Sequence, residues 1–217
     1  MTTVSAEDYI KTIYALESRS EKATTSRIAR EMGVTMGSVS GRIKSLARRG
    51  YLRHRPYYGV RLTGKGRRVA IRMVRRHRLI ELFLVKSLNL SWDEVHADAE
   101  VLEHAVSDRL LERMYEYLGR PEFDPHGSPI PRADGSVRQM ATTPLSALSV
   151  GASGEVRQVS GSDGPFLRYL SSLALAVGTR FQVVHRAPFG GPIELKTGRR
   201  RVVLGVEAAD RILVRES

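Results

Sequence analysis

The sequence of 217 residues predicts a mainly α-helical protein with a small β domain at its C-terminal end. Three observations support this fold class. Through most of residues 5–118 apolar side chains recur every three or four positions, the period of amphipathic helices. A proline-rich connector, residues 121–131, ends that pattern. From residue 145 onward, short apolar segments separated by Gly and Pro indicate strands.

The N-terminal segment predicts three short helices. Ser5 has capping-box spacing and begins a helix that runs to about residue 18. Threonines that can cap helix starts predict a second helix over 26–32 and a third over 36–48. Gly33 ends the second helix, so the pattern is helix, glycine-containing turn, helix.

A hairpin follows these helices. Residues 51–55 and 59–62 alternate in polarity on either side of a turn at 56–58. A helix-turn-helix followed by a small hairpin is a winged helix-turn-helix, and we expect residues 1–63 to form it.

The positive charge is concentrated near the N-terminus. Residues 1–80 hold 19 Lys and Arg against 5 Asp and Glu, whereas residues 81–217 hold 16 against 18. Such a basic module is typical of polyanion binding, because neutralised phosphates release counterions. A membrane surface is the competing partner. The arginines do not form one face of a single amphipathic helix, so nucleic acid is favoured.

Other features narrow the class of protein. The chain has no Cys, which excludes disulfides and thiolate metal sites. Its N-terminus lacks the pattern of a signal peptide, and no apolar run approaches the about 18 residues that span a bilayer. We expect a cytoplasmic protein with no membrane partner.

Two long amphipathic helices are predicted over 64–87 and 92–118, and both need a partner surface. After the connector, residues 132–139 read as a flexible linker. The segments that follow are strand-like, apart from a helical patch at 165–173, and predict a small β-barrel. These segments are 154–159, 180–184, 193–195, 201–204 and 211–214.

The third helix is the predicted recognition helix. Its first turns carry small hydroxyl groups and one arginine, which suit the major groove. The candidate residues there are Thr35, Gly37, Ser38, Ser40 and Arg42. Neighbouring arginines would reach phosphates and add affinity more than sequence choice. These are Arg27, Arg30, Arg53, Arg55 and Arg61. The alternative is a structural three-helix subdomain with polar outer faces.

Four potential metal ligands share one face of the second long helix. They lie at positions i, i+4, i+7 and i+8, namely His96, Glu100, Glu103 and His104. His77 and Glu81 are one turn apart on the preceding helix, and Asp8 could complete the set. Imidazole with carboxylate suits Mn²⁺ or Fe²⁺.

Three alternatives use the same residues. Each residue alone has a structural explanation, such as a capping box for Asp8 or an ion pair between Glu103 and Arg109. The whole cluster could be a salt-bridged core in a DNA-binding protein that needs no metal. A divalent-metal hydrolase would need similar ligands. The sequence has no HExxH, P-loop, nucleophile elbow or dinucleotide fingerprint, so we expect no enzyme and no small-molecule substrate.

The order of these features resembles the diphtheria toxin repressor family of metal-dependent regulators. The resemblance covers nearly the whole chain and is most specific in five stretches. They are residues 8–14, 73–81, 95–108, 124–131 and 188–192.

The resemblance implies a winged helix-turn-helix, a helical dimerisation domain over 64–131, a linker over 132–144 and an SH3-like domain over 145–217. It implies a main metal site and a second one, hence two sites per subunit. The main site comprises Asp8, His77, Glu100, Glu103 and His104. The second comprises Glu81, Asp124, His126 and Asp163, and His96 is an ancillary candidate.

Departures from the iron-type pattern set the expected metal. Asp8 stands where iron-type members have Met, and Glu100 where they have Cys. Carboxylates in place of sulfur favour Mn²⁺, with Fe²⁺ as the alternative. Lys11 replaces a second carboxylate of two-domain manganese regulators, and Gly41 replaces an amide side chain of the recognition helix. The resemblance therefore implies a manganese-dependent homodimeric repressor of palindromic promoter DNA, without fixing its operator sequence.

Overall fold

The computed structural model describes residues 6–55, 59–160 and 163–217. The chain divides into two compact units, which are described separately. The N-terminal unit extends to Arg76 and includes Pro131–Ser136, and the C-terminal unit comprises His77–Ile130 and Val137–Ser217. Ser5 and the hairpin turn predicted at 56–58 lie outside the described residues.

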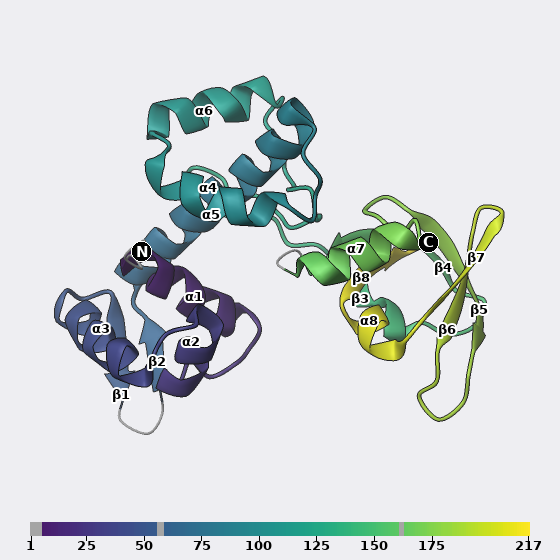
Figure 1. Ribbon diagram of the computed structural model, residues 1–217, viewed down its shortest axis with the longest axis horizontal. Coiled ribbons are helices and arrows are strands. Elements are labelled where there is room, and N and C mark those ends of the chain that lie inside the picture. The colour runs from purple at the N-terminus through teal and green to yellow at the C-terminus, as the bar shows by residue number, and fades with distance from the viewer. Residues whose placement is uncertain (1–5, 56–58, 161–162) are drawn as a thin grey trace. The chain divides into compact units, whose positions relative to one another are not determined.

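The N-terminal unit is a three-helix cluster with a two-stranded hairpin (Figure 1). The helices are α1 (Ala6–Ser18), α2 (Thr25–Met32) and α3 (Met36–Arg48). The antiparallel strands are β1 (Leu52–Arg55) and β2 (Gly59–Leu62), and the first half of α4 (Gly64–Leu88) follows. The predicted winged helix-turn-helix is therefore present.

Local chemistry explains the helix boundaries in this unit. The hydroxyl of Thr24 accepts a hydrogen bond from Arg27 N at the start of α2, and that of Thr35 accepts one from Ser38 N at the start of α3. Gly33 ends α2 with φ +63°, a left-handed conformation that suits glycine. Helix α3 buries Val39, Ile43 and Leu46 in the core and leaves its other side to solvent.

The C-terminal unit begins with the second half of α4, followed by α5 (Val95–Ala105) and α6 (Asp108–Tyr117). The expectation of one helix over 92–118 is wrong. Val106 is extended, with ψ 128°, and Ser107 caps α6 by accepting a hydrogen bond from Leu110 N at 3.2 Å. The apolar period continues across this break, so periodicity alone does not reveal it.

Replacing Ser107 with alanine should lower the free energy of unfolding by about 1 kcal/mol, because Leu110 N loses its acceptor. Thermal unfolding followed by circular dichroism measures the change. Ser107→Asp keeps an acceptor and should unfold close to the wild-type temperature. Equal unfolding temperatures for Ser107→Ala and wild type would show that this cap adds nothing to stability.

The remainder of the unit is a six-stranded antiparallel sheet of strand order β3-β8-β4-β5-β6-β7. Its strands are β3 (Thr143–Pro144), β4 (Ser153–Val159), β5 (Arg180–Arg186), β6 (Ile193–Thr197), β7 (Arg200–Leu204) and β8 (Ile212–Glu216). Helices α7 (Gly164–Ser172) and α8 (Val206–Asp210) and the 3₁₀ turn η1 (Leu145–Ala147) complete it. Among the described residues no ladder joins β3 to β7, so the expected barrel is an open sheet.

The two parts of this unit have separate hydrophobic cores. One lies among α4, α5 and α6, with Leu79 and Val95 at its centre, and the other lies under the sheet, around Leu170 and Val183. The fold class, mainly α with a small SH3-like β domain, is confirmed. In the part of the chain that the structure describes, no helix is long and apolar enough to cross a membrane.

Candidate metal centre and DNA-binding surface

His77 is the centre of a cluster of ionisable side chains on α4 and α5. Its Nδ1 lies 2.6 Å from Glu103 Oε2, and its Nε2 lies 2.9 Å from Glu81 Oε1 and 3.0 Å from His96 Nδ1. Glu103 and Glu81 are almost fully buried, although each is a carboxylate. Buried carboxylates need partners, and here imidazoles supply them.

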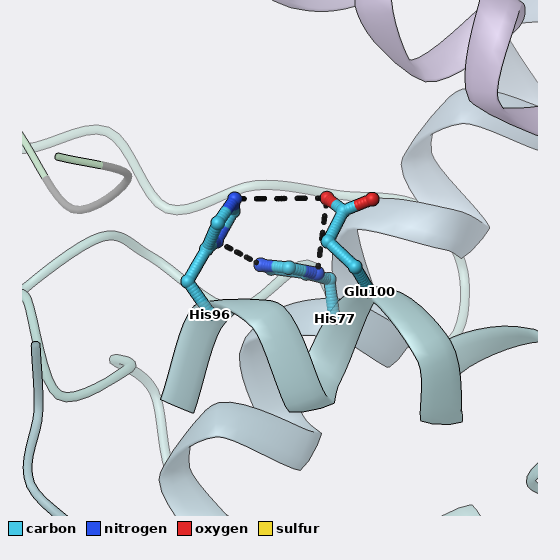
Figure 2. A group of neighbouring side chains, drawn as sticks. All are labelled: His77, His96 and Glu100. Atoms are coloured by element: carbon cyan, nitrogen blue, oxygen red, sulfur yellow. Dashed lines mark hydrogen bonds and ion pairs between the residues drawn. The ribbon is translucent and has the colours of Figure 1, made fainter. Parts of the chain in front are cut away.

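Figure 2 shows how His77, His96 and Glu100 converge from these helices. Glu100 Oε1 lies 3.8 Å from His77 Nδ1 and 3.7 Å from His96 Nε2. The rings of His77 and His96 meet edge to face, with centroids 4.8 Å apart. These three side chains offer two nitrogens and one oxygen close enough to bind one cation. His96 lies one helical turn before Glu100, as its position in the sequence predicts, and both side chains belong to this cluster.

Glu81, Asp124 and His126 form a neighbouring buried group. His126 Nδ1 lies 3.7 Å from Glu81 Oε2 and 4.0 Å from Asp124 Oδ1. Asp124 Oδ1 also accepts hydrogen bonds from the backbone N–H groups of His126 and Ser128, at 2.8 and 2.9 Å. The connector is therefore folded around its own carboxylate, with its two ligand candidates held side by side.

Burial and neighbouring charges shift the pKa of each group in this set. Burial, followed by repulsion from Glu81, raises the pKa of Asp124 to about 6, against the attraction of Arg78 and His126. Burial also opposes the charge of Glu81, but the imidazoles of His126, His77 and His96 outweigh it and hold the Glu81 pKa well below its usual range. The pKa of His126 is raised, because the attraction of Glu81 and Asp124 exceeds the effect of burial.

The donor set fits a hard or borderline divalent cation. All candidates offer imidazole nitrogen or carboxylate oxygen, and the chain has no Cys to supply a thiolate. A cation bound by this group would offset the repulsion between the buried carboxylates of Glu81 and Asp124.

The other predicted ligands lie as follows. His104 is exposed on α5, with its Nε2 3.6 Å from Glu103 Oε1. Asp8 lies on α1, in the N-terminal unit. Asp163 caps α7 by accepting a hydrogen bond from Phe166 N and forms a 2.9 Å ion pair with Arg211, and it is not in the group around Glu81.

Two residues near His126 were not predicted from the sequence. The Trp92 ring stacks on the His126 ring, with centroids 5.7 Å apart, and its backbone carbonyl accepts a hydrogen bond from His126 Nε2 at 2.9 Å. Ser128 lies within the connector, and its backbone N–H donates a hydrogen bond to Asp124 Oδ1. The only sequence signal was a single Trp in the chain, placed just before a helix that carries candidate ligands.

The predicted recognition helix presents its polar side to solvent. Gly37, Ser38 and Ser40 are exposed, and Ser40 Oγ donates a hydrogen bond to Met36 O. Arg42 is half-buried, with its guanidinium 5.8 Å from the centroid of the Tyr9 ring. Lys44, which was not among the predicted DNA contacts, is exposed one turn beyond Ser40. Its i, i+4 spacing from Ser40 was the available signal.

The wing carries a concentration of positive charge. Arg53 and Arg61 are exposed and directly opposite each other in the β1–β2 ladder. Like charges placed opposite on two strands destabilise a hairpin unless an anion lies nearby. On α2, Arg27 forms a 2.6 Å ion pair with Glu21. Arg55 lies on β1, and its side chain is outside the described residues.

A winged helix-turn-helix joined to a helical domain with candidate nitrogen and oxygen ligands for a metal is typical of one class of protein: DNA-binding regulators that respond to a metal ion. Family models match three consecutive parts of the chain. Residues 1–60 match the N-terminal DNA binding domain of iron dependent repressors, and residues 63–132 their metal binding and dimerisation domain. Residues 143–216 match the FeoA domain.

Known proteins agree with these matches. A solved manganese-dependent transcriptional repressor in complex with manganese is 42% identical, with a TM-score of 0.91 over 98% of this chain and 100% of that one. The iron-dependent repressor IdeR of Mycobacterium leprae is 31% identical over 96% of this chain and 95% of its own. The regulator MntR of Bacillus subtilis is 36% identical over 57% of this chain and 87% of its own. The chain belongs to the iron-dependent repressor family of metal-dependent transcriptional regulators, which confirms the resemblance drawn from its sequence.

Proposed function

We propose that this protein is a manganese-dependent transcriptional repressor that binds promoter DNA as a homodimer when Mn²⁺ is bound. The observation that carries the proposal is the buried cluster of imidazoles and carboxylates around His77 and Glu81. It contains hard and borderline donors only, which suit Mn²⁺. The 42% identity to a manganese-dependent repressor across nearly the whole chain supports the same metal.

Two metal sites per subunit are proposed. The main site comprises Asp8, His77, Glu100, Glu103 and His104. The second comprises Glu81, Asp124 and His126. Asp163 is a further candidate, but its ion pair with Arg211 would have to break before it could bind the metal. His96 contacts both His77 and Glu81, so it is available to either site.

The regulatory step follows from the origin of the ligands. With Asp8 on α1 as a ligand, Mn²⁺ binding would restrict the DNA-binding unit to fewer positions. The metal would thereby favour conformations in which both recognition helices of a dimer match their half-sites. A two-fold dimer requires half-sites about one helical turn, or a multiple of it, apart, hence a palindromic operator.

The helical domain offers a surface for the second subunit. Large apolar side chains are exposed on α4, α5 and α6, among them Leu88, Val101 and Tyr117. Several exposed large apolar side chains on one domain are consistent with an interface. The family model for this region, a dimerisation domain, supports the same assignment.

Iron is the second candidate metal, because an iron-dependent repressor is 31% identical over nearly the whole chain. The side chains at the main site favour Mn²⁺ over Fe²⁺. Asp8 and Glu100 are carboxylates at positions where the iron-type members that the sequence resembles have sulfur ligands. Anaerobic titration with Fe²⁺ distinguishes the two.

Calorimetric titration of metal-free protein should give two Mn²⁺ ions per subunit. His126→Ala should remove one of them, because the group around Glu81 loses its imidazole. His185→Ala, at an exposed position on β5, is the matched control and should retain both. Unchanged stoichiometry in His126→Ala would remove the connector from the proposed second site.

A further inference from the structure

The backbone of the connector (residues 121–131) directly contacts the FeoA-like domain (residues 143–216). The carbonyl of His126 accepts a hydrogen bond from Val159 N at 2.9 Å. Next to it, Gly127 adopts φ +82°, and a Cβ at this position would lie 1.9 Å from Arg157 O. Arg157 lies at the point where β4 shifts register against β8, a bulge that bends the strand. Only glycine permits so close an approach to this bulge.

Trp92 connects the ring of His126 to the same domain. The indole packs against the hydrophobic core of the sheet domain, and its Nε1 donates a 2.8 Å hydrogen bond to Ser171 Oγ on α7. Its face stacks on the imidazole at an interplanar angle of 20°. The contact between the domains is extended by an ion pair of 3.2 Å between Asp93 and Arg168.

These contacts select one nitrogen of His126 as a metal ligand. A backbone carbonyl can only accept a hydrogen bond, so Nε2 must carry a proton to donate to Trp92 O. Nδ1, which faces Glu81 and Asp124, is then the nitrogen whose lone pair is available for a cation.

We propose that the FeoA-like domain positions His126 for metal binding, with β4 holding its backbone at Gly127 and α7 holding its ring through Trp92. This inference rests on the proposed second site. It gives the FeoA-like domain a role in metal response that requires none of its own side chains to be a ligand.

The test uses the whole 217-residue chain and its single tryptophan. Gly127→Ala should weaken Mn²⁺ binding at the second site by about tenfold or more, the scale of positioning residues around metal ligands. Gly135→Ala is the control, because Gly135 has nearly the same φ, +85°, but only an Ile71 side-chain atom at 3.8 Å from a Cβ. It carries the same backbone strain without the clash, and should bind as wild type.

A milder pair of variants covers the case in which Gly127→Ala does not fold. Ser171→Ala removes the acceptor of the indole N–H, whereas Ser172→Ala, the control, removes a hydroxyl that donates a hydrogen bond to Tyr169 O within α7. We expect weaker second-site binding and a changed quenching of Trp92 fluorescence by Mn²⁺ in Ser171→Ala alone.

The outcomes separate this inference from the proposed function. If wild type binds two Mn²⁺ ions and Gly127→Ala and Ser171→Ala bind them with wild-type affinities, the positioning role is wrong and the sites stand. If wild type shows no second Mn²⁺ ion, the second site itself is wrong and this inference is overturned with it. Loss of second-site affinity in these variants, with both controls unchanged, supports the inference.

Discussion

Replacing Glu103 with glutamine should abolish the manganese dependence of DNA binding while the protein remains folded. The Glu103 side chain is fully buried, and its carboxylate lies 2.6 Å from His77 Nδ1. Glutamine preserves the shape and an oxygen that accepts a hydrogen bond, but it removes the negative charge that would hold a cation at the proposed site. The stimulation of operator affinity by Mn²⁺, which we expect to be about 100-fold in wild type, should fall to near unity.

Glu116→Gln is the matched control, because Glu116 forms an exposed ion pair with Arg113 on α6. It should respond to Mn²⁺ as wild type does. Calorimetry measures Mn²⁺ binding by both variants, and circular dichroism measures whether they are folded. Together the two methods distinguish loss of the metal site from loss of the fold. Full manganese dependence in Glu103→Gln would show that Glu103 is not a metal ligand.

Placing a negative charge at Ser40 should eliminate operator binding with or without metal. Ser40 is exposed on the polar side of α3, between the cap at Thr35 and Lys44. In the major groove, a glutamate there would face phosphates and base-edge acceptors, and like-charge repulsion of this kind costs several kcal/mol. We expect at least about 100-fold weaker binding in fluorescence anisotropy, with Mn²⁺ affinity unchanged.

Ser40→Gln separates charge from size. It is as large as glutamate and neutral, so its loss of affinity should be much smaller. Equal losses in Ser40→Glu and Ser40→Gln would assign the effect to bulk. Wild-type affinity in Ser40→Glu would remove this side of α3 from the DNA interface.

The features that could be predicted from sequence are local ones. Threonine caps and Gly33 defined α2 and α3, because a cap satisfies backbone groups within a few residues. The i, i+4 spacing placed His77 with Glu81 and His96 with Glu100, because helical geometry alone fixes such neighbours. The strand segments from 154 onward were also found, since each is bounded by Gly or Pro turns.

The features that were missed depend on contacts distant in sequence or on short elements. The break between α5 and α6 interrupts the helix without interrupting the apolar period. Strand β3 and helix α8 have too few residues to show a pattern. The stacking of Trp92 on His126, and the close approach of Gly127 to β4, join segments that no spacing rule connects.

The most direct test of the account is a fluorescence-anisotropy titration of a palindromic promoter duplex with metal-stripped protein. It compares Mn²⁺, anaerobic Fe²⁺ and no metal at one fixed salt concentration, because salt sets the non-specific baseline. Metal-dependent repression predicts tight, specific binding with Mn²⁺, reversed by a chelator, and only non-specific binding without metal. Specific binding that persists without any metal would contradict it, and would leave a DNA-binding protein in which the His and carboxylate cluster is structural.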